Sequence, residues 1–157
     1  MPLTQPDVSE PSPNNPVRLV DHLLAQYGES HQHPTNELIH YAAIPLIVFS
    51  LIGMLQWVHP YLALFTVAGS VVYYARLSTL FMVIMTLFAA ISLYLVGLMG
   101  AALLPVSIAI FVVSWVFQFI GHKIEGKKPS FFEDLQYLLV GPLFVLSKLL
   151  ARLGLKW

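Results

Sequence analysis

The chain has 157 residues, of which 57% are hydrophobic and only 10% are charged, and its mean hydropathy is +0.74. Soluble domains carry about a quarter charged residues, so this composition indicates a membrane protein. The formal net charge is zero, which argues against the basic surface that nucleic-acid binding requires. The absence of cysteine excludes disulfides, thiolate metal sites and cysteine nucleophiles.

The N-terminal part is predicted to contain a tail and a surface helix. Residues 1–16 include five prolines, no positive charge and no apolar run, so we expect a disordered tail and no signal peptide. Beyond it, Leu19, Leu23 and Tyr27 recur at four-residue intervals with Val20 and Leu24 beside them on one stripe, and Gly28 can end the helix. This amphipathic pattern predicts a short helix on the membrane surface.

Four apolar segments without Lys, Arg, Asp or Glu follow the surface helix. A membrane-crossing helix needs about 20 apolar residues, and the segments approach that length, the second being the shortest. His59 and Pro60 mark the turn between the first two segments. The predicted spans cover about 41–58, 61–74 and 80–97, and a fourth begins within a turn at 100–105 and continues to residue 120.

The cations predict which side of the membrane each loop occupies. Arg76 follows the second span and Lys123, Lys127 and Lys128 follow the fourth, whereas the loops after the first and third spans carry no Lys or Arg. The positive-inside rule therefore places the N-terminus, Arg76 and the loop 121–129 on the cytoplasmic side. We interpret Lys127 and Lys128 first as a topology signal, although they can also attract acidic head groups.

The last apolar stretch, residues 135–157, is interrupted by Gly141 and Pro142. Beyond this break, three cations recur every four residues opposite an apolar stripe, and a fifth span would carry them to the wrong side. We therefore predict a C-terminal helix in the cytoplasmic interface, with a re-entrant segment at 135–141 as the alternative. The cations are Lys148, Arg152 and Lys156, and the stripe consists of Val145, Leu146, Leu149, Leu150 and Leu153.

Together these elements predict an all-α fold. We expect a polytopic membrane helix bundle of about four transmembrane helices, with interfacial helices at both ends. Residues 17–157 are expected to form one membrane domain. The sequence leaves the oligomeric state open.

Histidines gather on both sides of the predicted spans. His31, His33 and His40 lie before the first span or at its start, and His122 directly follows the fourth. Because four crossings return the chain to the same face, these imidazoles are expected to meet at the membrane edge. A single interfacial histidine is usually only an amphipathic residue, as we expect for His59, but several are costly near hydrocarbon unless paired or bound to a metal. The pattern therefore predicts a metal site.

Three further polar residues lie beside these histidines. If the fourth span continues as a helix for one more turn, Gln118, His122 and Glu125 fall on one face at i, i+4 and i+7. Asn36 and His40 are four residues apart, where Asn36 or the threonine before it can cap the helix. Imidazoles with a carboxylate and no sulfur favour Fe(II) or Zn(II), and the spacing does not choose between them. Glu125, Gln118 and Asn36 are the candidate catalytic residues.

Two short motifs resemble those of the Mpo1-like membrane protein family, and the resemblance extends from about residue 26 to residue 150. The first motif lies before the first span and the second at the end of the fourth, and a Gly-Pro pair follows near the C-terminus. The motifs are His31-x2-Pro34-x-Asn36-x3-His40 and Trp115-x2-Gln118-x2-Gly121-His122-x2-Glu125-Gly126-x-Lys128-Pro129, and the pair is Gly141-Pro142.

The resemblance implies the activity known for the yeast member of that family. That protein is an Fe(II)-dependent dioxygenase of the endoplasmic reticulum, which uses O2 to shorten 2-hydroxy fatty acids by one carbon in phytosphingosine breakdown. By motif position, His31, His40 and His122 would hold the iron, and His33 is a further candidate ligand. The acyl chain would lie within the lipid bilayer, either in the endoplasmic reticulum or in a bacterial inner membrane. Candidates for steering its carboxylate are Lys123, Lys127 and Lys128.

Three other functions are open at this point. A zinc-dependent membrane hydrolase would use the same ligands to activate water and would not need O2. A non-catalytic membrane scaffold would tolerate loss of the histidines. A transporter would need polar groups deep within the spans, and Gln56 and Gln118 both lie near span ends.

Overall fold

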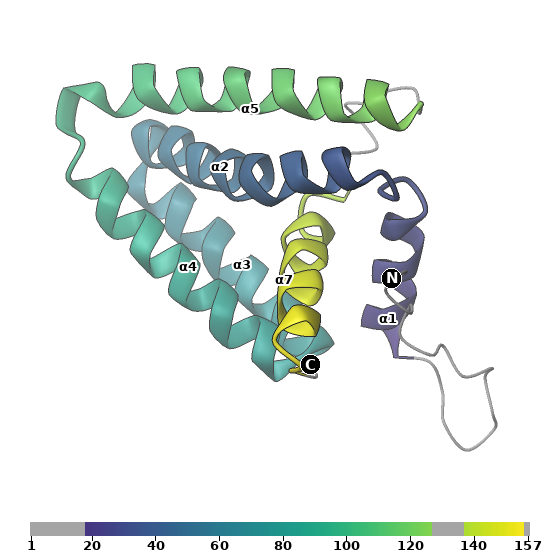
Figure 1. Ribbon diagram of the computed structural model, residues 1–157. Coiled ribbons are helices and arrows are strands. Elements are labelled where there is room, and N and C mark those ends of the chain that lie inside the picture. The colour runs from purple at the N-terminus through teal and green to yellow at the C-terminus, as the bar shows by residue number, and fades with distance from the viewer. Residues whose placement is uncertain (1–17, 127–136, 156–157) are drawn as a thin grey trace.

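The computed structural model describes residues 18–126 and 137–155, and within these residues every regular element is a helix (Figure 1). This confirms the all-α prediction. Several sequence predictions lie outside the described residues, namely the tail at 1–16, residues 135 and 136 of the re-entrant segment at 135–141, and the roles of Lys127, Lys128 and Lys156. The elements are α1 (Leu19–Gly28), α2 (Pro34–Val58), α3 (Pro60–Leu77), α4 (Thr79–Gly97), the short 3-10 helix η1 (Gly100–Ala102), α5 (Leu103–Glu125) and α7 (Val140–Arg152).

Helix α1 occupies the predicted position, and part of its predicted apolar stripe is buried. Val20, Leu24 and Tyr27 are buried, whereas Leu19 is 62% exposed. The spacings of four and three residues between the buried positions follow one side of a helix, because a turn has 3.6 residues. Tyr27 is the residue that α1 places beside the candidate site.

Helix α2 begins earlier than predicted. It starts at Pro34, and the N-terminal cap is His33, whose Nδ1 accepts a hydrogen bond from the backbone N–H of Thr35 at 3.2 Å. The prediction that Thr35 or Asn36 caps the helix was therefore wrong, because proline at the first helical position already has the required backbone geometry. The earlier start places both Asn36 and His40 inside the helix.

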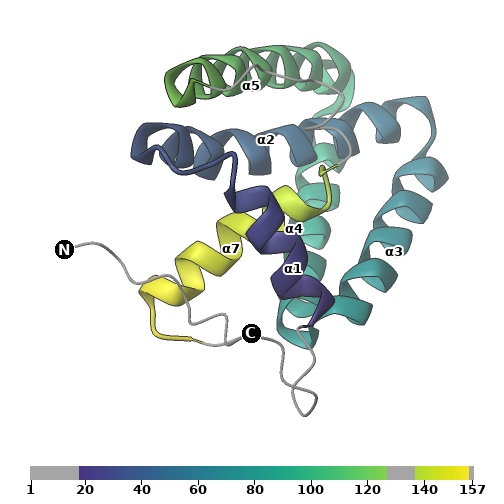
Figure 2. The ribbon, with the colours of Figure 1, turned by 90° about the vertical axis from the view of Figure 1, so that its right-hand side faces the viewer.

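The long helices form two antiparallel pairs, α2 with α5 and α3 with α4 (Figure 1). The two pairs meet where His59 joins α2 to α3 and where η1 joins α4 to α5, and they diverge towards their other ends. Helices α1 and α7 lie in the resulting opening and cross each other there (Figure 2). The first turns of α2 and the last turns of α5 therefore lie together at one end of the α2–α5 pair.

Helices α2 and α5 approach closely because small residues line their interface. A Cβ atom added to Gly53 on α2 would overlap the Ser107 hydroxyl on α5, and Ser50 and Ser114 are also buried. Small side chains are what allow helix backbones to approach within a membrane. This close pairing fixes the position of α5 relative to α2 and hence of the residues at their shared end.

Helix α7 packs into the opening with a different face from the one predicted. Leu143, Phe144, Ser147 and Leu150 are buried, whereas Leu149 of the predicted apolar stripe is exposed. Gly141 and Pro142 lie in the first turn of α7 and do not interrupt it, since proline is tolerated in a first turn. The main apolar core joins α1, α2, α3, α4 and α7, and it includes Val20, Leu24, Tyr27, Ile44, Tyr74, Phe81, Met85, Leu143 and Phe144.

Among the described residues, three helical segments are long and apolar enough to cross a membrane: α2, α4 and the segment Gly100–Glu125 that contains α5. Helix α3, expected as the second span, is not among them. Its last turns carry Tyr73, Tyr74 and Arg76, which lower its apolar character. Large apolar side chains are exposed on α3, α4 and α5, as expected for surfaces that face lipid. Examples are Phe65, Leu87 and Val112.

Candidate metal centre

Three histidines from three separate segments converge in the interior. His31 lies in the connection between α1 and α2, His40 in the second turn of α2, and His122 in the last turn of α5. One ring nitrogen of each lies within 4.8 Å of the other two, and the side chains are 3%, 0% and 4% exposed. The predicted meeting of the two histidine-bearing stretches is confirmed.

The hydrogen bonds of two of these rings fix which nitrogen carries the proton. The Nδ1 atom of His31 lies 2.7 Å from the carbonyl of Tyr27, and the Nδ1 atom of His40 lies 2.9 Å from the carbonyl of Asn36. A carbonyl only accepts, so each Nδ1 donates, and in the neutral ring Nε2 then carries a lone pair. The two Nε2 atoms face each other at 3.0 Å. Two facing lone pairs repel unless a proton or a metal cation lies between them.

This arrangement fits a metal ion. Metal–nitrogen bonds of about 2.0–2.1 Å readily join two nitrogens 3.0 Å apart to one ion. Ligand histidines commonly donate their second ring N–H to a carbonyl, which fixes the ring and raises the basicity of the binding nitrogen. His31 and His40 both make this hydrogen bond, and both use the backbone one helical turn earlier in the chain.

Aromatic side chains hold the histidine rings in place. The ring of Tyr27 stacks on the His31 ring with a centroid distance of 4.2 Å and an interplanar angle of 9°. The ring centroid of Phe144 on α7 lies 5.6 Å from that of His31. Sequence reasoning assigned Tyr27 only to the apolar stripe of α1 and did not single out Phe144. The spacing of apolar residues predicts a buried stripe but not which side chain it meets.

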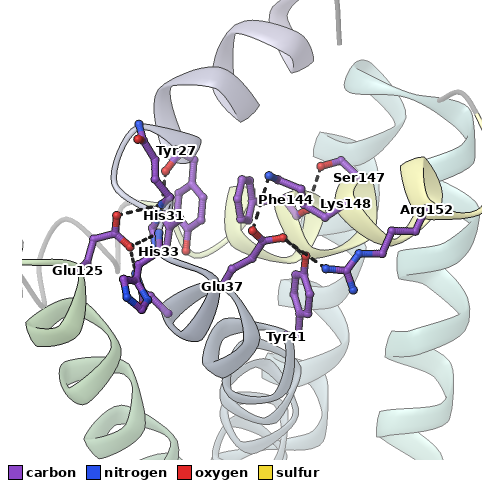
Figure 3. Close-up of polar contacts among 12 residues, drawn as sticks. Tyr27, His31, His33, Glu37, Tyr41, Glu125, Phe144, Ser147, Lys148 and Arg152 are labelled. Carbon is purple, nitrogen blue, oxygen red and sulfur yellow. Dashed lines mark hydrogen bonds and ion pairs between the residues drawn. The ribbon is translucent and has the colours of Figure 1, made fainter. Parts of the chain in front are cut away.

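Glu125 occupies a different position from the one expected of a ligand. Its carboxylate accepts hydrogen bonds from the backbone N–H groups of Gln32 and His33, at 3.0 and 2.8 Å, and from the Asn36 side chain at 3.1 Å (Figure 3). It is not part of the three-histidine group. The predicted extra turn of helix is present, because α5 ends at Glu125. The carboxylate thus joins the end of α5 to the segment that carries His31.

Asn36 and Gln118 are both buried beside the histidines. The Asn36 Nδ2 atom donates to Glu125, and its backbone carbonyl accepts from His40. Gln118 is 4% exposed, and its Oε1 atom has no hydrogen-bond partner among the described residues. It lies one turn before His122 on α5, as the predicted spacing requires.

Those of the remaining predicted site residues that the structure describes lie outside the cluster. His33 is exposed, caps α2, and does not belong to the three-histidine group. Lys123 is exposed near the end of α5. Lys127 and Lys128 lie outside the described residues. His59 caps α3 at the opposite end of α2, away from the cluster.

A second polar cluster, which the sequence did not reveal, joins α2 to α7 (Figure 3). Glu37 accepts a hydrogen bond from the Tyr41 hydroxyl, and its carboxylate lies 3.8 Å from Lys148 Nζ and 3.9 Å from the Arg152 guanidinium. Lys148 also lies over the Phe144 ring. Two of the cations expected to face lipid head groups therefore also contact a carboxylate of the protein.

Comparison with known proteins connects this geometry to a family. The family model described as "2-hydroxy-palmitic acid dioxygenase Mpo1-like" matches residues 17–153. The Saccharomyces cerevisiae protein named 2-hydroxy-palmitic acid dioxygenase MPO1 is 31% identical over an alignment of 150 residues, and the match covers 83% of this chain and 79% of the yeast protein. No solved structure matches the chain. The match over nearly the whole described chain shows that this protein belongs to the Mpo1-like family.

Proposed function

We propose that this protein is an Fe(II)-dependent dioxygenase that cleaves 2-hydroxy fatty acids to the acid one carbon shorter and CO2. The observation that carries the proposal is the buried group of His31, His40 and His122, in which two Nε2 lone pairs face each other at 3.0 Å. The name of the yeast relative, a 2-hydroxy-palmitic acid dioxygenase, supports the substrate class. The apolar helices around the site support a lipid substrate.

The donor set suits this chemistry. Three imidazoles, with no carboxylate among the described residues of the group, leave coordination positions for further ligands. A 2-hydroxy acid would offer its carboxylate and its hydroxyl as such ligands. When bound, Fe(II) would supply the redox chemistry that a reaction with O2 requires. Zn(II) suits the same ligands but would support hydrolysis, which makes a zinc-dependent hydrolase the second candidate function.

The overall reaction balances with O2 as the oxidant. The bond between C1 and C2 breaks, C1 leaves as CO2, and C2 becomes the carboxyl carbon of the shorter acid. The electrons removed from the substrate reduce O2, whose oxygen atoms are accounted for in the shorter acid, CO2 and one water. No further reductant is needed.

In this proposal the protein side chains bind and orient the substrate. Burial of the histidines keeps bulk water away from the reacting carbons. Glu125 holds the segment that carries His31, and Asn36 connects that carboxylate to the carbonyl that orients His40. Lys123, with Lys127 and Lys128, would draw the substrate carboxylate to the cytoplasmic rim. The membrane would be the endoplasmic reticulum or a bacterial inner membrane.

The test is metal content and turnover of protein purified without a His-tag and without added metal. We expect Fe(II) to restore O2-dependent consumption of 2-hydroxypalmitic acid after chelation. Replacing His31, His40 or His122 by Ala should abolish turnover and most metal binding while the protein remains folded in the membrane. The control His59→Ala should change neither property. Metal content and turnover that survive all three substitutions would refute the proposal and favour a scaffold, and O2-independent activity with Zn(II) would favour the hydrolase.

A further inference from the structure

A narrow, partly open pocket lies between α1, α2, α5 and α7, and its lining includes residues one helical turn from His40 and from His122. Ile44, which lines it, is one helical turn beyond His40, and Gln118 is one turn before His122. The remaining wall is apolar or aromatic and includes Trp115 of α5 and Gly141 of α7. A ligand whose polar end reaches the histidines would therefore place its next atoms in this pocket.

The pocket wall contains a buried hydrogen-bonding group that lacks a partner. The Oε1 atom of Gln118 is fully enclosed and makes no hydrogen bond within the described part of the chain. An unsatisfied buried polar atom is unfavourable, and a ligand that satisfies it gains a hydrogen bond at no further cost of burying that atom. A hydroxyl group suits the amide whichever way its oxygen and nitrogen are turned, because a hydroxyl both donates and accepts.

The width of the pocket depends on Gly141. A Cβ atom added at this position would lie 3.1 Å from Ile44 Cδ1 and 3.3 Å from the Tyr27 hydroxyl. Both atoms also belong to residues that line the pocket. The missing side chain therefore keeps a gap between α7 and α2, and a branched side chain at 141 would fill it.

We infer that this pocket holds the carbons next to the hydroxylated carbon of a 2-hydroxy fatty acid, with Gln118 hydrogen-bonded to the 2-hydroxyl and Gly141 setting the width. The inference rests on the proposed function and names the residues that would select its substrate. Because the pocket is narrow and partly open, the rest of the acyl chain continues between the helices into lipid. Selection therefore acts on the hydroxyl group and on the width of the chain near it, and only weakly on total length.

Quenching of Trp115 fluorescence tests the position of the chain without any turnover. The protein carries Trp57→Phe and Trp157→Phe, is loaded with Fe(II) under anaerobic conditions, and is titrated with 2-hydroxy fatty acids brominated either near the carboxyl end or near the methyl end. We expect the proximal bromines to quench Trp115 several-fold more strongly than the distal ones. Gly141→Val should remove this difference. The control Gly69→Val should keep it, because an added Cβ at Gly69 has no neighbour within 4 Å. Equal quenching by both acids, or a difference that survives Gly141→Val, would overturn the pocket assignment.

The role of Gln118 is tested by the ratio of affinities for a 2-hydroxy acid and the plain acid of the same length. Gln118→Met keeps the side-chain length but removes the hydrogen bond, so we expect this ratio to fall about tenfold with metal content unchanged. Gln56→Met is the matched control. Gln56 lies near the C-terminal end of α2, far along the helix from His40, so this substitution should leave the ratio unchanged. A merely structural role would weaken both affinities equally and leave the ratio unchanged, which would refute the assignment.

These measurements separate the two proposals. Binding with the expected quenching pattern but no oxidation of the acid would retain the pocket and reject the dioxygenase. Oxidation that proceeds unchanged in both Gly141→Val and Gln118→Met would retain the dioxygenase and reject the pocket.

Discussion

Asn36 on α2 and Gly121 on α5 approach so closely that no side chain fits on the glycine. An added Cβ at Gly121 would overlap the Asn36 Oδ1 atom and lie 3.3 Å from its Cγ. Asn36 also donates to Glu125 and accepts from His40 through its backbone carbonyl. The helix contact and the orientation of one histidine therefore depend on the same residue.

Gly121→Ala is predicted to separate the two helices at the candidate metal centre. Overpacking of this kind costs about 1–3 kcal/mol, because α2 and α5 or the Asn36 side chain must move. We expect a lower Tm in detergent and weaker metal binding, measured by thermal denaturation and by metal titration.

The matched control for this change is Gly69→Ala on α3. A Cβ at Gly69 meets nothing within 4 Å, so replacing glycine within this helix should be neutral or stabilise it by up to about 1 kcal/mol. Equal effects of the two substitutions would contradict the importance of the contact between Asn36 and Gly121.

Much of the fold follows from sequence patterns that act locally. The ends of α2 and α4 at Val58 and Gly97 were predicted correctly because turn residues interrupt the apolar runs there. The return of the chain after the fourth segment predicted that His31, His40 and His122 meet. Turn residues and the number of apolar segments are sufficient for these two predictions.

The errors share a physical cause, which is contact with backbone or with a distant helix. Glu125 stays a candidate catalytic residue, but its hydrogen bonds to backbone N–H groups were not predicted, because no sequence pattern distinguishes such partners. The buried face of α7 was misassigned because Phe144 packs against Tyr27 and His31, a contact that local periodicity does not specify. The pairing of Glu37 with Lys148 was missed for the same reason.

Glu125→Gln is predicted to weaken metal binding without removing a ligand. The carboxylate accepts three N–H groups, and an amide would direct its own N–H₂ towards some of these donors. The segment carrying His31 should loosen, so we expect the metal Kd to rise about 10–100-fold while the stoichiometry at saturating metal is unchanged. Metal titration followed by X-ray absorption measures both quantities. Loss of an oxygen ligand from the absorption spectrum would instead identify Glu125 as a direct ligand.

Glu29→Gln is the control for charge removal near the same segment. Glu29 is exposed at the end of α1, and its backbone N–H, which the substitution retains, donates to the carbonyl of Ala25. Its metal Kd should equal that of the unmodified protein. A similar rise in both variants would indicate a general electrostatic effect of either carboxylate.

Docking of α7 is predicted to depend more on apolar burial than on its ion pairs. Phe144 is 2% exposed and contacts Tyr27 and His31, so Phe144→Ala should cost about 3–5 kcal/mol. Glu37→Gln weakens pairs whose cations are largely exposed, each worth about 0–1 kcal/mol. Hydrogen exchange of the α7 amides should therefore rise far more in Phe144→Ala. The reverse order would contradict this assignment.

The contact between Glu125 and the backbone of Gln32 and His33 constrains the number of membrane crossings. Two residues that touch lie on the same side, so the chain between them must cross an even number of times. Only α2, α4 and the segment containing α5 meet the length and hydropathy requirement among the described residues, which is an odd number. We therefore predict that α3 also crosses, with the pairing of α3 and α4 compensating for its weaker apolar character.

Single-cysteine labelling tests this prediction directly, since the chain has no cysteine of its own. Cysteines at Ser30 and Ser78 should react with an impermeant reagent from one face, and cysteines at Val58 and Ala101 from the other. Ser78 is a suitable position for a cysteine because its side chain makes no cap hydrogen bond, so the substitution should not disturb α4. If α3 does not cross, Ser78 reacts from the same face as Val58. Glu125 and Gln32 would then lie on opposite sides of the membrane. The three histidines could not meet on one face, and the proposed metal centre would be refuted.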